Sequence, residues 1–120
     1  MSFGISKQFQ FSASHRLDGL DRDHQCARLH GHNYTVELTL SAGPDELSKV
    51  GFVRDYGDLK EFSRWLDDEL DHRHLNDVIP FNPTAENLCR WIFEQWTTRY
   101  PELSAVRVSE TVKTWAEYRP

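Results

Sequence analysis

The sequence predicts an α+β fold in which strands paired as hairpins form an antiparallel sheet and two helices cover one face of it, in the order β-β-α-α-β-β. Two observations predict this class. Apolar and polar residues alternate with a period of two near both ends of the chain, and apolar residues recur at helical spacing between them. The length of 120 residues fits one domain, which we expect to occupy residues 1–120.

The composition restricts the partners of this domain. The formal net charge is −5, so the chain offers no basic field for nucleic acid or for an anionic membrane surface. The N-terminus lacks the apolar core of a signal peptide, and two cysteines are too few for a disulfide framework. We therefore expect a cytoplasmic protein. A domain of this size buries only about two-thirds of its unfolded surface, so we also expect other subunits to cover part of the sheet.

Two strands are predicted in the first third of the chain. In residues 3–15 the odd positions are mostly apolar, while the even positions from Ser6 to Ser14 are serine or glutamine. Residues 32–42 repeat this alternation with opposite parity. The segment between them, residues 16–29, has no periodicity and is longer than a hairpin connection needs, which is typical of a functional loop.

Two helices are predicted in the middle of the chain. Asp55 or Asp58 can cap the first helix, which should end near Asp71. Its apolar positions recur at helical spacing, namely Leu59, Phe62, Leu66 and Leu70. Thr84 can cap the second helix, which Pro101 closes. The apolar positions of this helix are Leu88, Trp91, Ile92 and Trp96.

Two further strands are predicted near the C-terminus. Residues 106–112 alternate, and residues 115–119 can pair back on them as a hairpin. Glu110 occupies a face that is otherwise made of valines. A carboxylate in such a place usually has a partner, and its two oxygens match the parallel N–H groups on the edge of a pterin or guanine ring. The alternative is a strand-end residue turned to solvent.

Three histidines are predicted to meet at the ends of the first two strands. His30 and His32 are two residues apart, so both point to the apolar face of the second strand. His15 ends the first strand on its own apolar face and lies opposite them if the strands pair antiparallel. One histidine there could be an ordinary core residue, but three unpaired rings would be costly to bury. The trio therefore predicts a metal site, and three nitrogens without a fourth protein ligand are typical of catalytic zinc.

Cys26 and the Asp71-His72 pair are the other candidates. Cys26 lies four residues before His30, where a thiol near a metal ion ionises more easily and can act as a base or nucleophile. The alternatives are a fourth metal ligand, which would close the site, and an inert buried thiol. Asp71 can fix the tautomer of His72 and raise its basicity, which suits a proton carrier. The alternative for this pair is a polar helix terminus.

Several short motifs occur in an order that resembles one family. The central motif is Cys26-Ala-Arg-Leu-His30-Gly-His32. The others, in order, run from Phe11 to Arg16, Asp55 to Tyr56, Leu70 to His72, Leu75 to Asp77, Asn82 to Asn87 and Ser109 to Thr111. The set is similar to the 6-pyruvoyltetrahydropterin synthase family. Its Cys-x-x-x-His-Gly-His form resembles the bacterial 6-carboxytetrahydropterin synthases of that family, which act in the pathway to queuosine and other 7-deazapurines.

The resemblance implies a fold and an assembly. The fold is the T-fold, or tunnelling fold, in which subunits join their antiparallel sheets into a barrel with the helices outside. The assembly is usually a homohexamer made of two trimers, with active sites between subunits. The site roles implied by residue matching are zinc ligands for His15, His30 and His32, general base for Cys26, proton-transfer partners for Asp71 and His72, and pterin anchor for Glu110.

The resemblance also implies a reaction. A zinc-dependent lyase would convert 7,8-dihydroneopterin triphosphate to 6-carboxy-5,6,7,8-tetrahydropterin and release triphosphate and acetaldehyde. One alternative is a 6-pyruvoyltetrahydropterin synthase, which expels triphosphate without cleaving the side chain. Another is a non-catalytic, zinc-stabilised oligomer that binds purine-like or pterin-like ligands.

Overall fold

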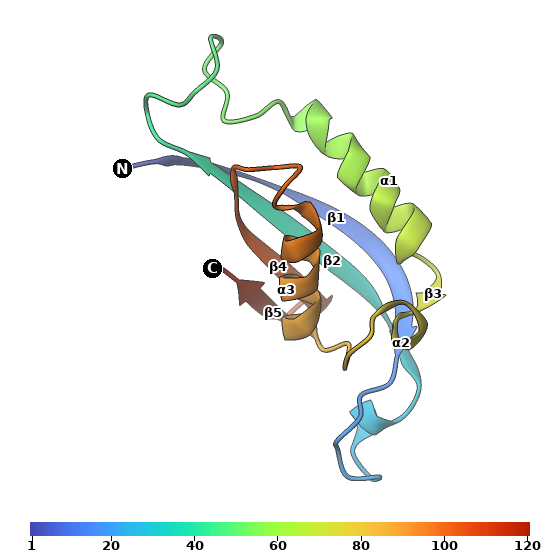
Figure 1. The fold of residues 1–120 in the computed structure, drawn as a ribbon. Coiled ribbons are helices and arrows are strands. Elements are labelled where there is room, and N and C mark those ends of the chain that lie inside the picture. The colour runs from blue at the N-terminus through green and yellow to red at the C-terminus, as the bar shows by residue number, and fades with distance from the viewer.

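The computed structural model describes residues 1–120 and contains one five-stranded sheet (Figure 1). The strands are β1 (Phe3–His15), β2 (His30–Ala42), β3 (Arg73–His74), β4 (Leu103–Thr111) and β5 (Thr114–Tyr118). Their order across the sheet is β3-β1-β2-β4-β5. The helices are α1 (Lys60–Glu69), α2 (Leu75–Val78) and α3 (Ala85–Trp96), with 3-10 turns η1 (Gln25–Ala27) and η2 (Tyr56–Leu59). The α+β class predicted from the sequence is confirmed.

The hairpin of β1 and β2 is the longest feature of the fold, with 13 residues in each strand. Its antiparallel register runs from Phe3 opposite Ala42 to His15 opposite His30. This register places the apolar odd positions of β1 on the same face as the apolar even positions of β2. The alternation in the sequence predicted both strands, and β2 begins two residues earlier than expected because His30 still pairs with β1.

The sequence predicted an antiparallel sheet, but the sheet is mixed. The short strand β3 pairs parallel with the end of β1 over two residues. The chain leaves α1 beside β1, where the N–H of His72 donates to the carbonyl oxygen of Ser12 at 2.6 Å. The backbone of His72 has a φ of 58°, a left-handed value that turns the chain onto this path. The helix α1 accordingly ends at Glu69, two residues before the expected end near Asp71.

The predicted cap Thr84 begins α3, whereas the predicted cap Asp55 begins the 3-10 turn η2 that precedes α1, and α1 itself has no side-chain cap. The side chain of Asp55 accepts a hydrogen bond from the N–H of Gly57 and caps η2, which continues directly into α1. The side chain of Thr84 accepts from the N–H of Asn87 and caps α3. The sequence did not predict α2, because a helix of four residues is too short to show a helical repeat.

The hydrophobic core lies between the long helices and one face of the sheet (Figure 1). On the sheet side, Phe11 and Tyr34 are cross-strand neighbours whose ring centroids are 4.8 Å apart. On the helix side, Phe62 of α1 and Ile92 of α3 join the same cluster. Both long helices therefore cover one face, as predicted, and the polar positions of the strands lie on the other. None of the helices has the length and apolar character needed to cross a bilayer.

The C-terminal hairpin forms as predicted, with one correction to its apolar face. Val112 was expected to continue that face, but it lies in the turn between β4 and β5 and is 95% exposed. The pairing of β4 with β5 shifts register between Val108 and Thr111. A shift of this kind redirects the side chains that follow it, so the buried face of valines ends at Val108.

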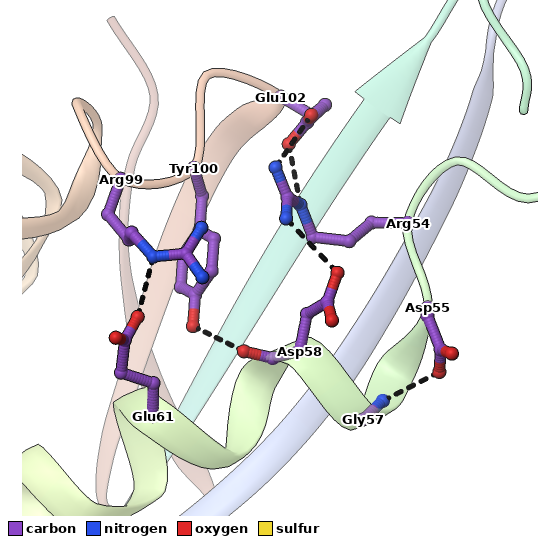
Figure 2. A network of polar contacts seen from close by, with 8 residues as sticks. All are labelled: Arg54, Asp55, Gly57, Asp58, Glu61, Arg99, Tyr100 and Glu102. Carbon is purple, nitrogen blue, oxygen red and sulfur yellow. Dashed lines mark hydrogen bonds and ion pairs between the residues drawn. The ribbon is translucent and has the colours of Figure 1, made fainter.

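An ionic network joins the start of α1 to the chain that enters β4 (Figure 2). The guanidinium of Arg54 donates to both carboxylate oxygens of Glu102, at 2.9 and 3.0 Å, and to Asp58 at 3.2 Å. The hydroxyl of Tyr100 donates to the carbonyl oxygen of Asp58 at 2.9 Å. Because the side chain of Arg54 is only 17% exposed, this two-pronged ion pair is partly shielded from water and stabilises the packing of α1.

We predict that Arg54→Ala lowers the free energy of unfolding by about 1–3 kcal/mol, since it removes the fork and leaves Glu102 partly buried without its partner. Arg90→Ala is the matched control, because it removes an ion pair with Glu94 whose side chains are 65% and 58% exposed. That change should cost at most about 0.5 kcal/mol. Urea unfolding at one protein concentration measures both values, and equal losses would contradict the role given to Arg54.

Candidate active site

The register of β1 and β2 brings three imidazoles together at one end of the sheet. His15 is directly opposite His30, and His32 is opposite Ala13, so the three rings share the face that carries the core. Their centroids are 4.5 to 5.0 Å apart, and each ring offers a nitrogen within 4.8 Å of the others. His15 is fully buried and the other two are half-buried. The structure thus brings together the histidines that the sequence placed on one site.

The tautomers of two rings follow from their backbone partners. Nδ1 of His15 lies 2.8 Å from the carbonyl oxygen of Pro83, and Nδ1 of His30 lies 2.7 Å from that of Arg28. A carbonyl oxygen only accepts hydrogen bonds, so each Nδ1 carries a proton, and Nε2 of each ring carries a lone pair when the ring is neutral. The two Nε2 atoms are 2.9 Å apart. In neutral rings this contact joins two acceptors, and a shared cation would convert it into ligation.

The third ring has an unpaired nitrogen. Nε2 of His32 is buried and makes no hydrogen bond. Oε2 of Glu110 lies 3.6 Å from it, beyond hydrogen-bond distance. Burial lowers the pKa of both His15 and His32 below the ordinary value, which outweighs the opposite effect of the Glu110 carboxylate. Both rings are therefore neutral at neutral pH and keep a lone pair for a ligand.

These features fit a bound metal ion. Two facing lone pairs and one buried, unpaired nitrogen are each unfavourable in a protein interior, and one ion would satisfy all three. Three imidazoles without a fourth protein ligand are the donor set of catalytic zinc sites. Imidazole also binds other late first-row ions, so this donor set could hold a transition-metal ion without selecting one metal.

Glu110 faces the histidine trio from β4. It borders a cavity of about 390 Å³, together with Glu86 at the start of α3 and Trp115 and Glu117 of β5. Its side chain is 24% exposed and its carboxylate lies 3.6 Å from His32, so it points toward the trio and the cavity. The sequence did not single out Glu86 as a site residue, because its place on the cavity depends on the packing of α3 against β4 and β5.

Cys26 lies in η1, within the loop that connects β1 to β2. Its side chain is half-buried. Its N–H donates to Nδ1 of His24 at 3.1 Å, and its carbonyl oxygen accepts from the N–H of Leu17 at 3.0 Å. The side chains that lie close enough to share one ion are the three histidines, without Cys26. The thiol is therefore close to the histidine trio in the sequence, but it is not among the side chains that could share one ion.

Asp71 and His72 form a hydrogen-bonded dyad at the edge of the sheet. One oxygen of Asp71 accepts from the N–H of Ser12 at 2.8 Å, and the other lies 2.8 Å from Nδ1 of His72. The hydrogen bond from Ser12, with a smaller contribution from His72, holds the pKa of Asp71 below its usual value. The His72 side chain is 83% exposed, and no hydrogen bond or ion pair joins the dyad to Cys26 or to the trio.

A second cavity, of about 480 Å³, lies beside the dyad, and its lining includes Ser12, Ser14, Asn33, His72 and His74. His74 approaches Ser14, with 3.0 Å between Nδ1 and the hydroxyl oxygen. The sequence analysis missed His74 because its position depends on the parallel pairing of β3 with β1, across 60 residues of sequence. No local pattern predicts a pairing of that kind.

Comparison of the sequence with known proteins identifies close relatives. The profile of the 6-pyruvoyl tetrahydropterin synthase family matches residues 4–120. An Archaeoglobus fulgidus protein with a provisional 6-carboxy-5,6,7,8-tetrahydropterin synthase name is 36% identical over 119 residues, which cover 99% of this chain and 96% of that protein. The Haemophilus influenzae 6-carboxy-5,6,7,8-tetrahydropterin synthase is 31% identical over 146 residues, covering 98% and 99%.

Comparison of the structure gives the same result for the fold. The structure of Caenorhabditis elegans 6-pyruvoyl tetrahydropterin synthase superimposes with a TM-score of 0.84 at 27% identity, covering 100% of this chain and 96% of that one. An uncharacterised Wolinella succinogenes protein has a TM-score of 0.87 at 23% identity, covering 99% and 98%. The T-fold of the subunit, expected from the sequence, is therefore confirmed.

We predict that His30→Ala loses most of the bound metal, because the remaining two nitrogens can no longer hold an ion firmly. Cys26→Ala should retain the metal, because the thiol lies outside the donor set. Metal analysis of the purified variants measures both contents. If Cys26→Ala lost as much metal as His30→Ala, the thiol would have to be a metal ligand.

We predict that the metal-free protein becomes less stable as the pH falls from about 7.5 to about 5.5. Histidines in the unfolded chain bind protons near pH 6.5, whereas His15 and His32 in the folded chain bind them only at lower pH. The unfolded state therefore takes up more protons than the folded state, and the free energy of unfolding decreases as the pH is lowered. Urea unfolding across this range measures how steeply the free energy of unfolding depends on pH. This dependence should be weaker in His15→Gln, and an unchanged dependence would contradict the lowered pKa of His15.

Proposed function

The chain belongs to the 6-pyruvoyl tetrahydropterin synthase family, and we propose that it is a zinc-dependent lyase that makes 6-carboxy-5,6,7,8-tetrahydropterin. Its substrate is 7,8-dihydroneopterin triphosphate, and its other products are triphosphate and acetaldehyde. The observation that carries this proposal is the set of three histidine nitrogens with their facing or unpaired lone pairs. The names of the bacterial relatives support the carboxy product.

His15, His30 and His32 would hold the zinc ion. Bound there, the ion acts as a Lewis acid that polarises side-chain oxygens of the substrate and makes the adjacent C–H groups more acidic. The chain contributes the orientation of the rings, since the carbonyl oxygens of Pro83 and Arg28 fix Nδ1 and leave Nε2 for the ion.

Glu110 is the proposed anchor for the pterin ring. A carboxylate can accept two parallel N–H bonds from the guanidine-like edge of a pterin. The position of Glu110 beside His32, on the border of a cavity of about 390 Å³, supports this role. A ring bound there would bring its side chain toward the histidine trio.

Cys26 is the proposed general base, and Asp71 with His72 completes its proton-transfer system. The proposal that these groups belong to different subunits is supported by the exposure of His72, at 83%, on the edge of the sheet. The positive φ of His72 is a strained conformation for a residue with a side chain, and such strain is common at functional sites. A carboxylate bonded to Nδ1 leaves Nε2 of His72 free to exchange a proton with a partner.

We place the reaction in the cytoplasm, in the biosynthesis of queuosine and other 7-deazapurines, and propose a homohexamer made of two trimers. In that assembly the sheets would join into a barrel and each active site would lie between two subunits. Edge strands favour such an arrangement, because β3 and β5 have unpaired backbone groups on their outer sides.

A second candidate is the 6-pyruvoyltetrahydropterin synthase reaction, which expels triphosphate and keeps the substrate side chain intact. The similarity to the Caenorhabditis elegans structure favours it. A non-catalytic, zinc-stabilised binding protein is a weaker alternative, because a structural zinc site usually has four protein ligands and this donor set has three.

Incubation of the zinc-loaded protein with 7,8-dihydroneopterin triphosphate tests the proposal. We predict equal amounts of triphosphate and acetaldehyde, with activity lost after removal of zinc by a chelator. In Glu110→Gln one acceptor becomes a donor that faces a donor, so KM should rise by about 10- to 100-fold. Triphosphate without acetaldehyde would favour the second candidate, and absence of both products would favour a binding protein.

Co-expression of two inactive variants tests the assembly of the site. We predict that Cys26→Ala and His72→Ala are each inactive alone and that mixed oligomers recover activity. If a site combines Cys26 of one subunit with His72 of its neighbour, about a quarter of randomly assembled sites contain both groups. Mass spectrometry verifies the mixing. Verified mixed oligomers that remain inactive would mean that the two groups act within one subunit or do not act together.

A further inference from the structure

The loop that carries Cys26 begins directly after His15, and two asparagine side chains hold its first residues. Oδ1 of Asn76 accepts from the N–H of Arg16, and its Nδ2 donates to the carbonyl oxygen of Arg16, both at 2.8 Å. Asn82 does the same for Asp18, at 2.9 and 3.1 Å. Each asparagine therefore bonds both backbone groups of one loop residue.

A primary amide suits this task because it carries a donor and an acceptor side by side, as a peptide group of a neighbouring strand would. Arg16 and Asp18 are two residues apart, so in extended backbone their N–H and C=O groups point to the same edge. Leu17 lies between them and points to the other edge, where its N–H donates to the carbonyl oxygen of Cys26 at 3.0 Å. Residues 16–18 thus resemble a short middle strand between the asparagines and Cys26.

Asn82 is itself anchored at the start of α3. The carbonyl oxygen of Asn82 accepts from the N–H of Thr84 and from Nδ2 of Asn87, both at 2.9 Å, at the first turn of α3. The next carbonyl oxygen, that of Pro83, accepts from Nδ1 of His15. One segment therefore fixes the tautomer of His15 and the path of the loop that follows it.

Few other contacts hold this loop. No residue between positions 16 and 29 is buried, and Leu17, Cys26 and Ala27 are the half-buried ones. Hydrophobic packing therefore contributes little to the position of Cys26. Hydrogen bonds restrain it from both sides: those through residues 16–18, and that between Nδ1 of His30 and the carbonyl oxygen of Arg28.

We propose that Asn76 and Asn82 are positioning residues for the reaction, which set the place of the Cys26 thiol relative to the histidine trio by holding residues 16–18. The proposal rests on the proposed function, in which Cys26 is the general base. Neither asparagine touches the trio through its side chain, so the pair acts through the backbone of Arg16 and Asp18.

Asn76→Asp and Asn82→Asp test the proposal. Each exchange replaces the Nδ2 donor with an oxygen that faces a carbonyl oxygen, so the loop residue loses a bond without a change in side-chain size. Gln95→Glu is the matched control, because it makes the same chemical exchange at an exposed position of α3 that has no side-chain hydrogen bond. Activity on the pterin triphosphate, zinc affinity, amide hydrogen exchange and alkylation of Cys26 are compared in the four proteins.

In both aspartate variants we expect the amides of residues 16–18 to exchange roughly tenfold faster, and Cys26 to react roughly tenfold faster with iodoacetamide. The buried Cys89 supplies the internal reference for alkylation. We expect kcat to fall by about 10- to 100-fold, as for a displaced catalytic group, while KM and zinc affinity change less than about threefold. Gln95→Glu should match the wild type in every measurement.

An unchanged kcat in variants whose loop amides exchange faster would overturn the proposal. Residues 16–18 would then have been loosened without any effect on the reaction. A fall in zinc affinity in proportion to kcat would also overturn it, because the asparagines would then act on His15 and not on Cys26. Inactivity of the wild type would instead overturn the proposed function, and the exchange and alkylation rates would still show whether the asparagines hold Cys26 in place.

Discussion

The antiparallel register of β1 and β2 is the constraint on which the site depends. A slip of one residue would turn every side chain of a strand to the other face and would separate His15 from its partners. The same slip would expose the apolar residues that pack against α1 and α3, such as Phe11. The free energy of core burial therefore fixes the register, and the register fixes the histidine trio. The free energy of core burial also offsets the cost of bringing three unpaired rings together before an ion binds.

The two faces of the hairpin carry different chemistry at the same end of the sheet. The histidine trio lies on the core face, where burial keeps His15 and His32 neutral and ready to bind an ion. The Asp71-His72 dyad lies at the edge, bonded to the backbone of Ser12 and exposed to solvent. The positive φ of His72 turns the chain onto β3 within the subunit, whereas the 83% exposure of its side chain leaves the ring open to a partner. This contrast is the main physical argument for an active site shared between subunits.

Local patterns in the sequence were sufficient for the large elements and for the histidines. Strand alternation predicted β1 and β2, and the position of His15, His30 and His32 followed from it. Local patterns could not predict three other features: the pairing of β3 with β1, the hydrogen bonds of Asn76 and Asn82 to the loop, and the contact of Pro83 with His15. Each joins residues 60 to 68 positions apart, and tertiary structure alone brings them together. Val112 was misplaced for a related reason, since a register shift leaves no mark in the alternation that precedes it.

Backbone carbonyls hold His15 and His30 as Nδ1–H tautomers and so direct the two Nε2 atoms toward one point. Long-range ¹H–¹⁵N NMR of the metal-free protein near neutral pH tests this assignment most directly, because protonated and unprotonated ring nitrogens differ widely in ¹⁵N chemical shift. We expect a protonated Nδ1 and an unprotonated Nε2 in both rings. A proton on Nε2 of either ring would contradict it, since the 2.9 Å contact would then be an ordinary hydrogen bond that requires no metal ion.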